Sequence, residues 1–179
     1  MTSRQGDPDP EPDPEGVART IALRRLAAAP QTRAQLDDAM RRRGVADDVR
    51  STVLDRFGEV GLIDDAMFAG AWVESRHAGR GLAKRALAFE LRRRGVEPAV
   101  VDDAVSALAP EQEEATAGAL VAARLAGTRG LEPAARTRRL AGMLARKGYP
   151  PGLAFRVVRD ALTAQGVGEE QLPEEPAGG

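Results

Sequence analysis

Apolar residues recur along most of this chain at intervals of three and four residues, which is the spacing of one face of an α-helix. No stretch alternates apolar and polar residues as a half-buried strand would. Glycine and proline interrupt the pattern repeatedly, so the expected helices are joined by tight connections. The pattern therefore predicts an all-α protein.

A phrase that occurs three times organises this pattern. It consists of a leucine, three residues, an apolar residue, two or three basic residues, a glycine and a further apolar residue. Its glycines are Gly44, Gly95 and Gly148, which are 51 and 53 residues apart. Such a period indicates one supersecondary unit used three times, because a unit that cannot close its own core packs against its neighbours. We predict three tandem three-helix repeats in an elongated helical array.

The apolar residues around the three glycines keep the same register. Those 23 positions before the glycines are Ile21, Trp72 and Leu125, and those five positions after them are Val49, Val100 and Leu153. Apolar residues at matching positions predict a first, a middle and a third helix in every repeat. The expected repeats cover residues 16–63, 64–109 and 110–165.

Residues at the expected helix ends fit known capping patterns. Thr32 and Gln35 match a capping box at the start of a middle helix. Gly44 suits the left-handed conformation that ends a helix, and Asp47 suits an N-cap. Residues 77–81 contain two glycines and predict a break between two helices.

The two ends of the chain differ in composition from the repeats. Proline alternates with acidic residues over 7–14, and acidic pairs lie on both sides of Pro173. Such segments neither continue a helix nor bury apolar surface, so residues 1–15 and 166–179 are predicted to be disordered. The remainder holds 25 of the 26 basic residues and 18 of the 27 acidic residues, a net charge of +7. This excess favours a polyanionic or acidic partner.

The sequence contains no recognisable active site. It has no cysteine, one histidine and no motif of a phosphate loop, a zinc protease or a serine hydrolase. Adjacent aspartates occur four times, and we interpret them as helix caps and solvated charges because neighbours on a helix converge poorly on one ion. No catalytic residue, cofactor, metal or small-molecule substrate is therefore expected. No apolar stretch is long enough to span a bilayer, and no secretory signal is present, which predicts a cytoplasmic protein.

The basic residues of the repeated phrase are the candidates for function. Cations in the last turn of a helix stabilise its dipole, so a single cluster would need no partner. Clusters at equivalent positions would instead repeat a positive patch, which suits a nucleic-acid strand or a protein filament on one. The candidate partner-binding residues are Arg41, Arg42, Arg43, Arg76, Arg80, Lys84, Arg85, Arg92, Arg93, Arg94, Arg136, Arg138, Arg139, Arg146 and Lys147.

Three interpretations of these clusters remain open. They bind a filament, they bind DNA directly and without sequence preference, or they only cap helices in a neutral scaffold. Trp72 shares its register with core residues, so we expect it to pack internally. Because the few aromatic residues are expected to be internal, recognition by base stacking is disfavoured. His77 is expected to be exposed beside a glycine loop.

The second repeat resembles a known family. The resemblance rests on Gly61, Leu62, Ile63, Asp64, Asp65, Ala66, Met67, Phe68, Ala69, Trp72, Arg76, Arg80, Gly81 and the segment from Leu87 through Glu90 to Val96. Together with Leu23 to Leu26, Arg33 to Leu36 and the third phrase, these residues resemble the bacterial RecX regulators over about residues 17–165. The match is strongest in the first two repeats.

This resemblance implies a curved monomer of three three-helix repeats that is not an enzyme. Its implied partner is the RecA recombinase filament, and it would contact single-stranded DNA through that filament. Family members mostly restrain RecA, lowering its ATP hydrolysis, strand exchange and co-protease activity. The resemblance thus implies a role in recombination, DNA repair and control of the SOS response.

Overall fold

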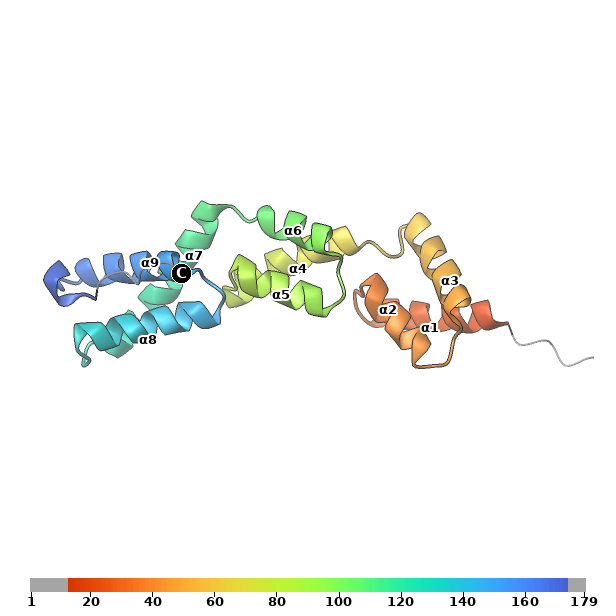
Figure 1. Ribbon diagram of the computed structural model, residues 1–179, viewed down its shortest axis with the longest axis horizontal. Helices are drawn as coiled ribbons and strands as arrows, with labels where there is room; N and C mark the ends of the chain where they lie inside the picture. The colour runs from red at the N-terminus through yellow and green to blue at the C-terminus, as the bar shows by residue number, and fades with distance from the viewer. Residues whose placement is uncertain (1–12, 174–179) are drawn as a thin grey trace, which may run out of the picture. The chain divides into compact units, whose positions relative to one another are not determined.

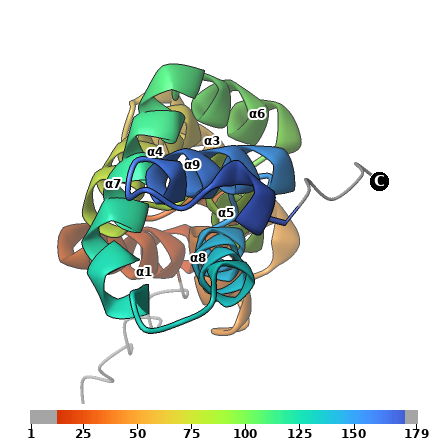
Figure 2. The ribbon, with the colours of Figure 1, turned by 90° about the vertical axis from the view of Figure 1, so that its left-hand side faces the viewer.

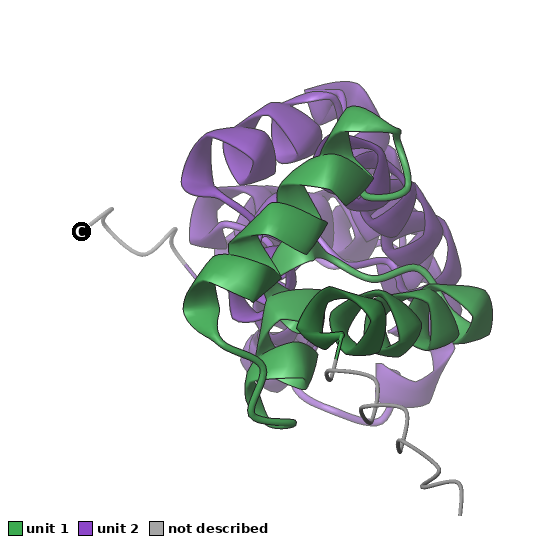
Figure 3. Cartoon of the chain, turned by 90° about the vertical axis from the view of Figure 1, so that its right-hand side faces the viewer, with its two compact units in different colours: residues 1–64 green, residues 65–179 purple. Residues whose placement is uncertain are grey.

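The computed structural model describes residues 13–173, and within this range the chain contains nine α-helices, two short 3-10 helices and no strand (Figure 1). The prediction of an all-α protein is confirmed. The chain divides into two compact units, an N-terminal unit of residues 1–64 and a C-terminal unit of residues 65–179 (Figure 3). The C-terminal unit holds two of the predicted repeats.

The N-terminal unit is one three-helix repeat. Its helices are α1 (Pro14–Ala28), α2 (Arg33–Arg41) and α3 (Asp47–Glu59), and each packs against the other two. Ala18, Leu36, Met40, Leu54 and Phe57 are buried at the centre. Small alanines on α1 allow the larger side chains of α2 and α3 to fill the space between the helices.

The C-terminal unit contains the second and third repeats. The second consists of α4 (Asp65–Arg80), α5 (Lys84–Arg93) and α6 (Pro98–Ser106), which pack around Leu87, Leu91 and Val101. The third consists of α7 (Pro110–Leu125), η1 (Ala126–Thr128), α8 (Pro133–Arg146), α9 (Pro151–Thr163) and η2 (Glu169–Gln171). Helix α9 packs against both α7 and α8, as seen along the unit in Figure 2. The six apolar residues in register with the glycines all pack against their own repeat's core.

The repeated phrase folds into the same turn three times. In the first copy the amide of Val45 donates to the carbonyl of Met40 at 3.2 Å, and the amide of Gly44 donates to that of Arg41 at 3.0 Å. This is the Schellman motif, which needs a left-handed residue, and Gly44 has φ of 77°. The amides of Val96 and Tyr149 donate in the same way, each at 3.2 Å. The predicted glycine caps are therefore confirmed.

The helix ends and starts agree with the sequence except at two places. The capping box of Thr32 and Gln35 is present. Asp47 was predicted to cap α3, but the cap is Ala46 and Asp47 lies in the first turn, where its carboxylate pairs with Arg50. The predicted break at residues 77–81 was also wrong in extent, because α4 continues to Arg80 and the chain turns only at Gly81, with φ of 61°.

The predicted disordered ends were too long. Asp13 caps α1 by accepting from the amide of Gly16, and Pro14 occupies the first helical position, where its missing amide costs nothing. At the other end Gly166 forms a further Schellman turn, and Val167 and Leu172 pack against the third core. The sequence signal was a glycine followed by an apolar residue, as in the repeated phrase. The remaining parts of both predicted segments, residues 1–12 and 174–179, lie outside the described residues.

Within the C-terminal unit the turn of the third repeat also joins it to the second. The Tyr149 hydroxyl donates to the carbonyl of Gly81 at 3.1 Å, and the Lys147 ammonium donates to that of Arg80 at 2.6 Å. The amide of Ala83 donates to the carbonyl of Lys147 at 2.9 Å. Burial, together with the charge of Glu113, raises the pKa of Tyr149 to about 12. The third copy of the phrase is thus a structural joint.

Candidate partner-binding surface

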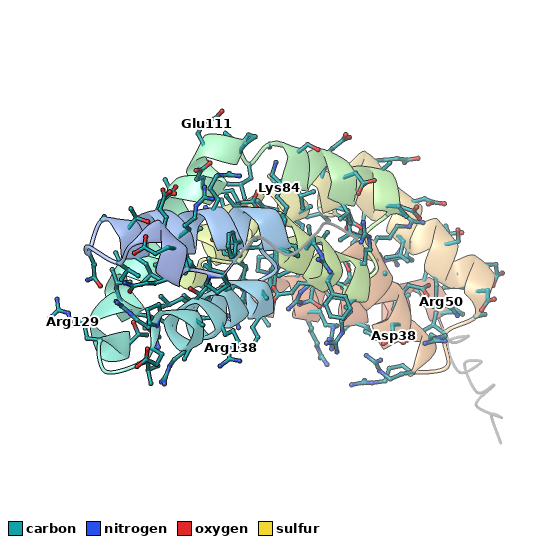
Figure 4. The ribbon with its side chains drawn as sticks, turned by 60° about the vertical axis from the view of Figure 1, so that its left-hand side comes forward. Asp38, Arg50, Lys84, Glu111, Arg129 and Arg138 are labelled. Carbon is teal, nitrogen blue, oxygen red and sulfur yellow. The ribbon has the colours of Figure 1, made fainter. Side chains whose placement is uncertain are left out.

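The basic cluster of the first repeat is largely neutralised. Arg41 and Arg42 both donate to the carboxylate of Asp38, one turn back on α2 (Figure 4). Arg43 is exposed, and no carboxylate of the described chain lies within 4.0 Å of it. Three cations in sequence therefore provide one exposed cation without an acidic partner.

A fourth arginine in this repeat was missed by the sequence reasoning. Arg50 is only 9% exposed, and its guanidinium donates to Asp37, to Asp47 and to the carbonyl of Val45. The hydrogen bond to Asp37 is the main cause that raises the pKa of Arg50. Its position is apolar in the other two repeats, where Val101 and Ala154 are buried, so no repeated signal pointed to it. Arg50 stabilises the turn between α2 and α3.

In the second repeat the basic side chains gather around the indole of Trp72. The guanidinium carbon of Arg94 lies 3.7 Å from the centre of the indole, and that of Arg76 lies 4.2 Å away. Glu90 accepts from the indole nitrogen at 2.9 Å and pairs with Arg76 and Arg80 at 3.9 and 3.5 Å. Trp72 is half-buried against the core, so the expectation of a packed tryptophan holds, but its ring also orients two arginines.

The outer face of α5 carries both charge and an exposed aromatic ring. Phe89 is 60% exposed, and the guanidinium of Arg93 lies 5.8 Å from its centre. The expectation that all aromatic residues are internal was therefore wrong. The helical register could have shown it, because Leu87 and Leu91 face the core and Phe89 lies between them on the opposite side. Arg92 pairs with Asp102 at 3.4 Å, and Arg85 is exposed.

The candidates of the third repeat divide into buried and exposed residues. Arg136 is 7% exposed and donates to Thr128 and Gln165, so its inclusion as a binding residue was wrong and it serves the fold. Lys147 belongs to the joint with the second repeat. Arg138, Arg139 and Arg146 are exposed, and Arg138 extends away from α8 (Figure 4).

Two basic grooves lie side by side on the C-terminal unit. The first, of about 570 Å³, runs between α5, α6 and α8, and the charged residues that line it are Lys84, Arg85, Arg92, Asp102 and Arg146. The second, of about 310 Å³, lies between α7, η1 and α8 and is lined by Arg124, Arg139 and Arg146. We call them the α5 groove and the α7 groove. Arg146 lines both of them.

A larger hollow of about 710 Å³ on the same unit has the opposite character. It lies between α4, α6 and α7 and is lined mostly by alanine, glycine and valine, with Glu74 and Asp103. His77 is at its wall but is 4% exposed, so the expectation of an exposed histidine was wrong. Its Nδ1 donates to the carbonyl of Leu82 at 2.9 Å, and Nε2 lies 2.8 Å from the hydroxyl of Thr116. The histidine thereby joins the second and third repeats.

Half of the eight adjacent aspartates, including Asp47, pair with arginines. Asp37 pairs with Arg50, Asp38 with Arg41 and Arg42, and Asp102 with Arg92. Among residues 13–173 no group of three potential metal ligands gathers in one place. No helix in the same range is long and apolar enough to cross a membrane.

Tandem three-helix domains with basic turns define this chain as a helical-repeat protein, and comparison with known proteins identifies its family. Three family models match it in order, namely the first, second and third three-helix domains of RecX, at residues 18–57, 64–105 and 111–158. The regulatory protein RecX of Thermobifida fusca is 60% identical over 167 residues, which is 92% of this chain and 90% of that protein. The regulatory protein RecX of Streptomyces lividans is 57% identical over 174 residues, which is 97% and 93% of the two chains.

A solved structure supports the same fold. The crystal structure of RecX from Lactobacillus salivarius superposes with a TM-score of 0.79 at 15% identity, covering 84% of this chain and 98% of that one. The chain belongs to the RecX family of regulatory proteins, which by family are regulators and not enzymes.

Proposed function

We propose that this protein binds the RecA recombinase filament on single-stranded DNA and restrains its ATP hydrolysis, strand exchange and co-protease activity. It would act as a monomer in the cytoplasm and limit recombination, DNA repair and the SOS response. One observation carries the proposal beyond family membership. Each repeat presents an exposed arginine that has no described carboxylate within 4.0 Å, namely Arg43, Arg93 and Arg138.

Such cations suit a partner that is itself repetitive and negatively charged. A cation already paired with a carboxylate gains little from an anionic partner, because the existing pair must be broken first. Unpaired cations carry no such cost and also steer the encounter with a polyanion. Substitution of these three arginines should therefore weaken partner binding more than substitution of paired arginines.

The test follows RecA ATP hydrolysis on single-stranded DNA while the protein is added. The triple variant Arg43→Gln, Arg93→Gln and Arg138→Gln should need about tenfold more protein for half-maximal inhibition, as expected from the loss of three weak charge contacts. A matched triple variant changes paired arginines, Arg33→Gln, Arg156→Gln and Arg159→Gln, and should stay near the wild type. If the wild-type protein neither binds the filament nor alters hydrolysis, the proposed function is wrong.

A further inference from the structure

We propose that the α5 and α7 grooves form one track that binds single-stranded nucleic acid directly, with phosphates on the cations and a base on Phe89. The inference deepens the proposed function and rests on it for its setting, because the filament holds such a strand. It assigns the DNA contact to one surface of the C-terminal unit, whereas the sequence indicated the basic clusters of all three repeats equally.

Charge is the first argument. The two grooves together are lined by six basic side chains and one carboxylate, Asp102, which pairs with Arg92 at 3.4 Å. For Arg85, Arg124, Arg139 and Arg146, no carboxylate of the described chain lies within 4.0 Å. A concave surface lined by one sign of charge concentrates the counter-charged ligand. These cations can therefore take phosphates without breaking an existing ion pair.

Continuity along α8 is the second argument. Arg139 and Arg146 are seven residues apart, which places them on one face of the helix two turns apart. Arg139 lines the α7 groove and Arg146 lines both grooves, so the lining passes from one to the other without a change of sign. A ligand with several phosphates along a chain matches this track better than a single anion does.

The exposed ring is the third argument, and it selects a single strand. Arg85, Phe89 and Arg93 follow one another at intervals of four residues, so they lie in a row on α5, and the guanidinium of Arg93 lies 5.8 Å from the centre of the ring. Phe89 lines the α5 groove and is 60% exposed. Aromatic rings beside a basic groove bind unpaired bases by stacking, and the bases of a duplex are already stacked on one another. The row therefore favours a single strand over a duplex.

The experiment measures the fluorescence anisotropy of a labelled oligothymidine titrated with the full chain at several salt concentrations, without RecA. Wild-type protein should bind with an affinity that falls as salt rises. Arg146→Gln should weaken binding about fivefold and reduce the salt slope by about 0.7, the value expected for one lost phosphate contact on a single strand. Phe89→Ala should weaken binding about tenfold, and Phe89→Tyr, which keeps the ring, should restore it.

Arg159→Gln is the matched control, because Arg159 is exposed on α9, pairs with Asp160 and lines neither groove. It should bind the oligothymidine like the wild type, and circular dichroism should show the same helix content for all variants. The inference is overturned if wild-type protein does not bind bare DNA at low salt, or if Arg146→Gln and Phe89→Ala bind it as Arg159→Gln does. Labelled polyglutamate is titrated in the same way. The inference is also overturned if Arg146→Gln and Phe89→Ala weaken binding to polyglutamate but not to the oligothymidine, because the track would then be a site for an acidic protein.

The two proposals can fail separately. Binding of bare DNA by the grooves with no effect on RecA would remove the proposed function and keep the track. Inhibition of RecA by a protein that does not bind bare DNA would keep the function and remove the track. Both assays contain single-stranded DNA, but the anisotropy assay contains no RecA, so a failure of the proposed function alone does not change its result.

Discussion

The first and third repeats carry the same turn and use it differently. Both turns form the same hydrogen bonds, with Gly44 at φ of 77° and Gly148 at 89°. Among the described residues other than its two chain neighbours, no heavy atom lies within 4 Å of a Cβ built on Gly44. A Cβ on Gly148 would lie 2.6 Å from the backbone nitrogen of Ala86. The same phrase thus ends a helix in one repeat and also holds two repeats together in the other.

The basic residues of the two turns differ in the same way. In the first repeat Arg41 and Arg42 are paired with Asp38. In the third repeat Lys147 donates to a carbonyl of the second repeat, while Arg146 remains exposed in two grooves. Repetition of a sequence phrase therefore shows that the backbone is repeated, and it does not show that each side chain has the same role.

The largest expected effect separates the two glycines. Gly148→Ala should lower the free energy of unfolding by about 2–5 kcal/mol, because it adds backbone overlap to the strain of the left-handed conformation. Gly44→Ala should cost only the strain, about 1–2 kcal/mol. Hydrogen exchange measured by mass spectrometry assigns the loss to the correct unit. Equal losses for the two variants would contradict the assignment of Gly148 to the joint.

A smaller effect is expected at the buried arginine of the third repeat. Arg136→Ala removes charged hydrogen bonds to Thr128 and Gln165 and should cost about 1.5–3 kcal/mol in unfolding free energy. Arg138→Ala, two residues later on the exposed face of α8, should change it by less than about 0.5 kcal/mol. Urea denaturation followed by circular dichroism measures both. Similar values would mean that burial does not distinguish these neighbours.

The smallest effect concerns the residue after each glycine, which is Val45 in the first repeat and Tyr149 in the third. Tyr149→Phe removes one hydroxyl bond to Gly81 and should cost about 0.5–1.5 kcal/mol at neutral pH. The folded pKa of about 12 exceeds the ordinary value of 10, so the protonated tyrosine stabilises the fold below pH 10. That contribution is lost as the pH rises from about 10 to about 12.

The measurement for this residue is the difference in unfolding free energy between wild type and Tyr149→Phe as a function of pH. Lysines titrate in the same range in both proteins, so the difference isolates the tyrosine. It should fall by about 2 kcal/mol between pH 10 and 12 and so reverse its sign, because ionised Tyr149 is disfavoured in the fold and phenylalanine does not ionise. Parallel curves for the two proteins would show that Tyr149 has no raised pKa.

The backbone of each repeat was predictable from sequence because its signals are local. The capping box at Thr32 and the left-handed glycines depend on residues a few positions apart, and both are present in the structure. The end of α9 carried the same local signal at Gly166 and Val167, but the acidic composition that follows concealed it.

The candidate site was less predictable, because the role of a cation depends on residues distant in sequence. Buried Arg136 donates a hydrogen bond to Gln165, which is 29 residues away in the sequence. Lys147 donates one to the carbonyl of Arg80, which is 67 residues away. Buried His77 is hydrogen-bonded to the hydroxyl of Thr116, which is 39 residues away. Composition and spacing contain no information on these pairings, so the sequence overestimated the number of cations available to a partner.

The tryptophan in contact with Arg76 and Arg94 gives the protein a built-in optical reporter. Trp72 is the single tryptophan of the sequence, so all indole emission comes from the second repeat. Its indole nitrogen is hydrogen-bonded to Glu90, and its ring is in contact with two guanidinium groups, whose charge influences emission. Movement of either guanidinium toward a ligand will change the colour and intensity of that emission. Events confined to the first or third repeat will leave it unchanged.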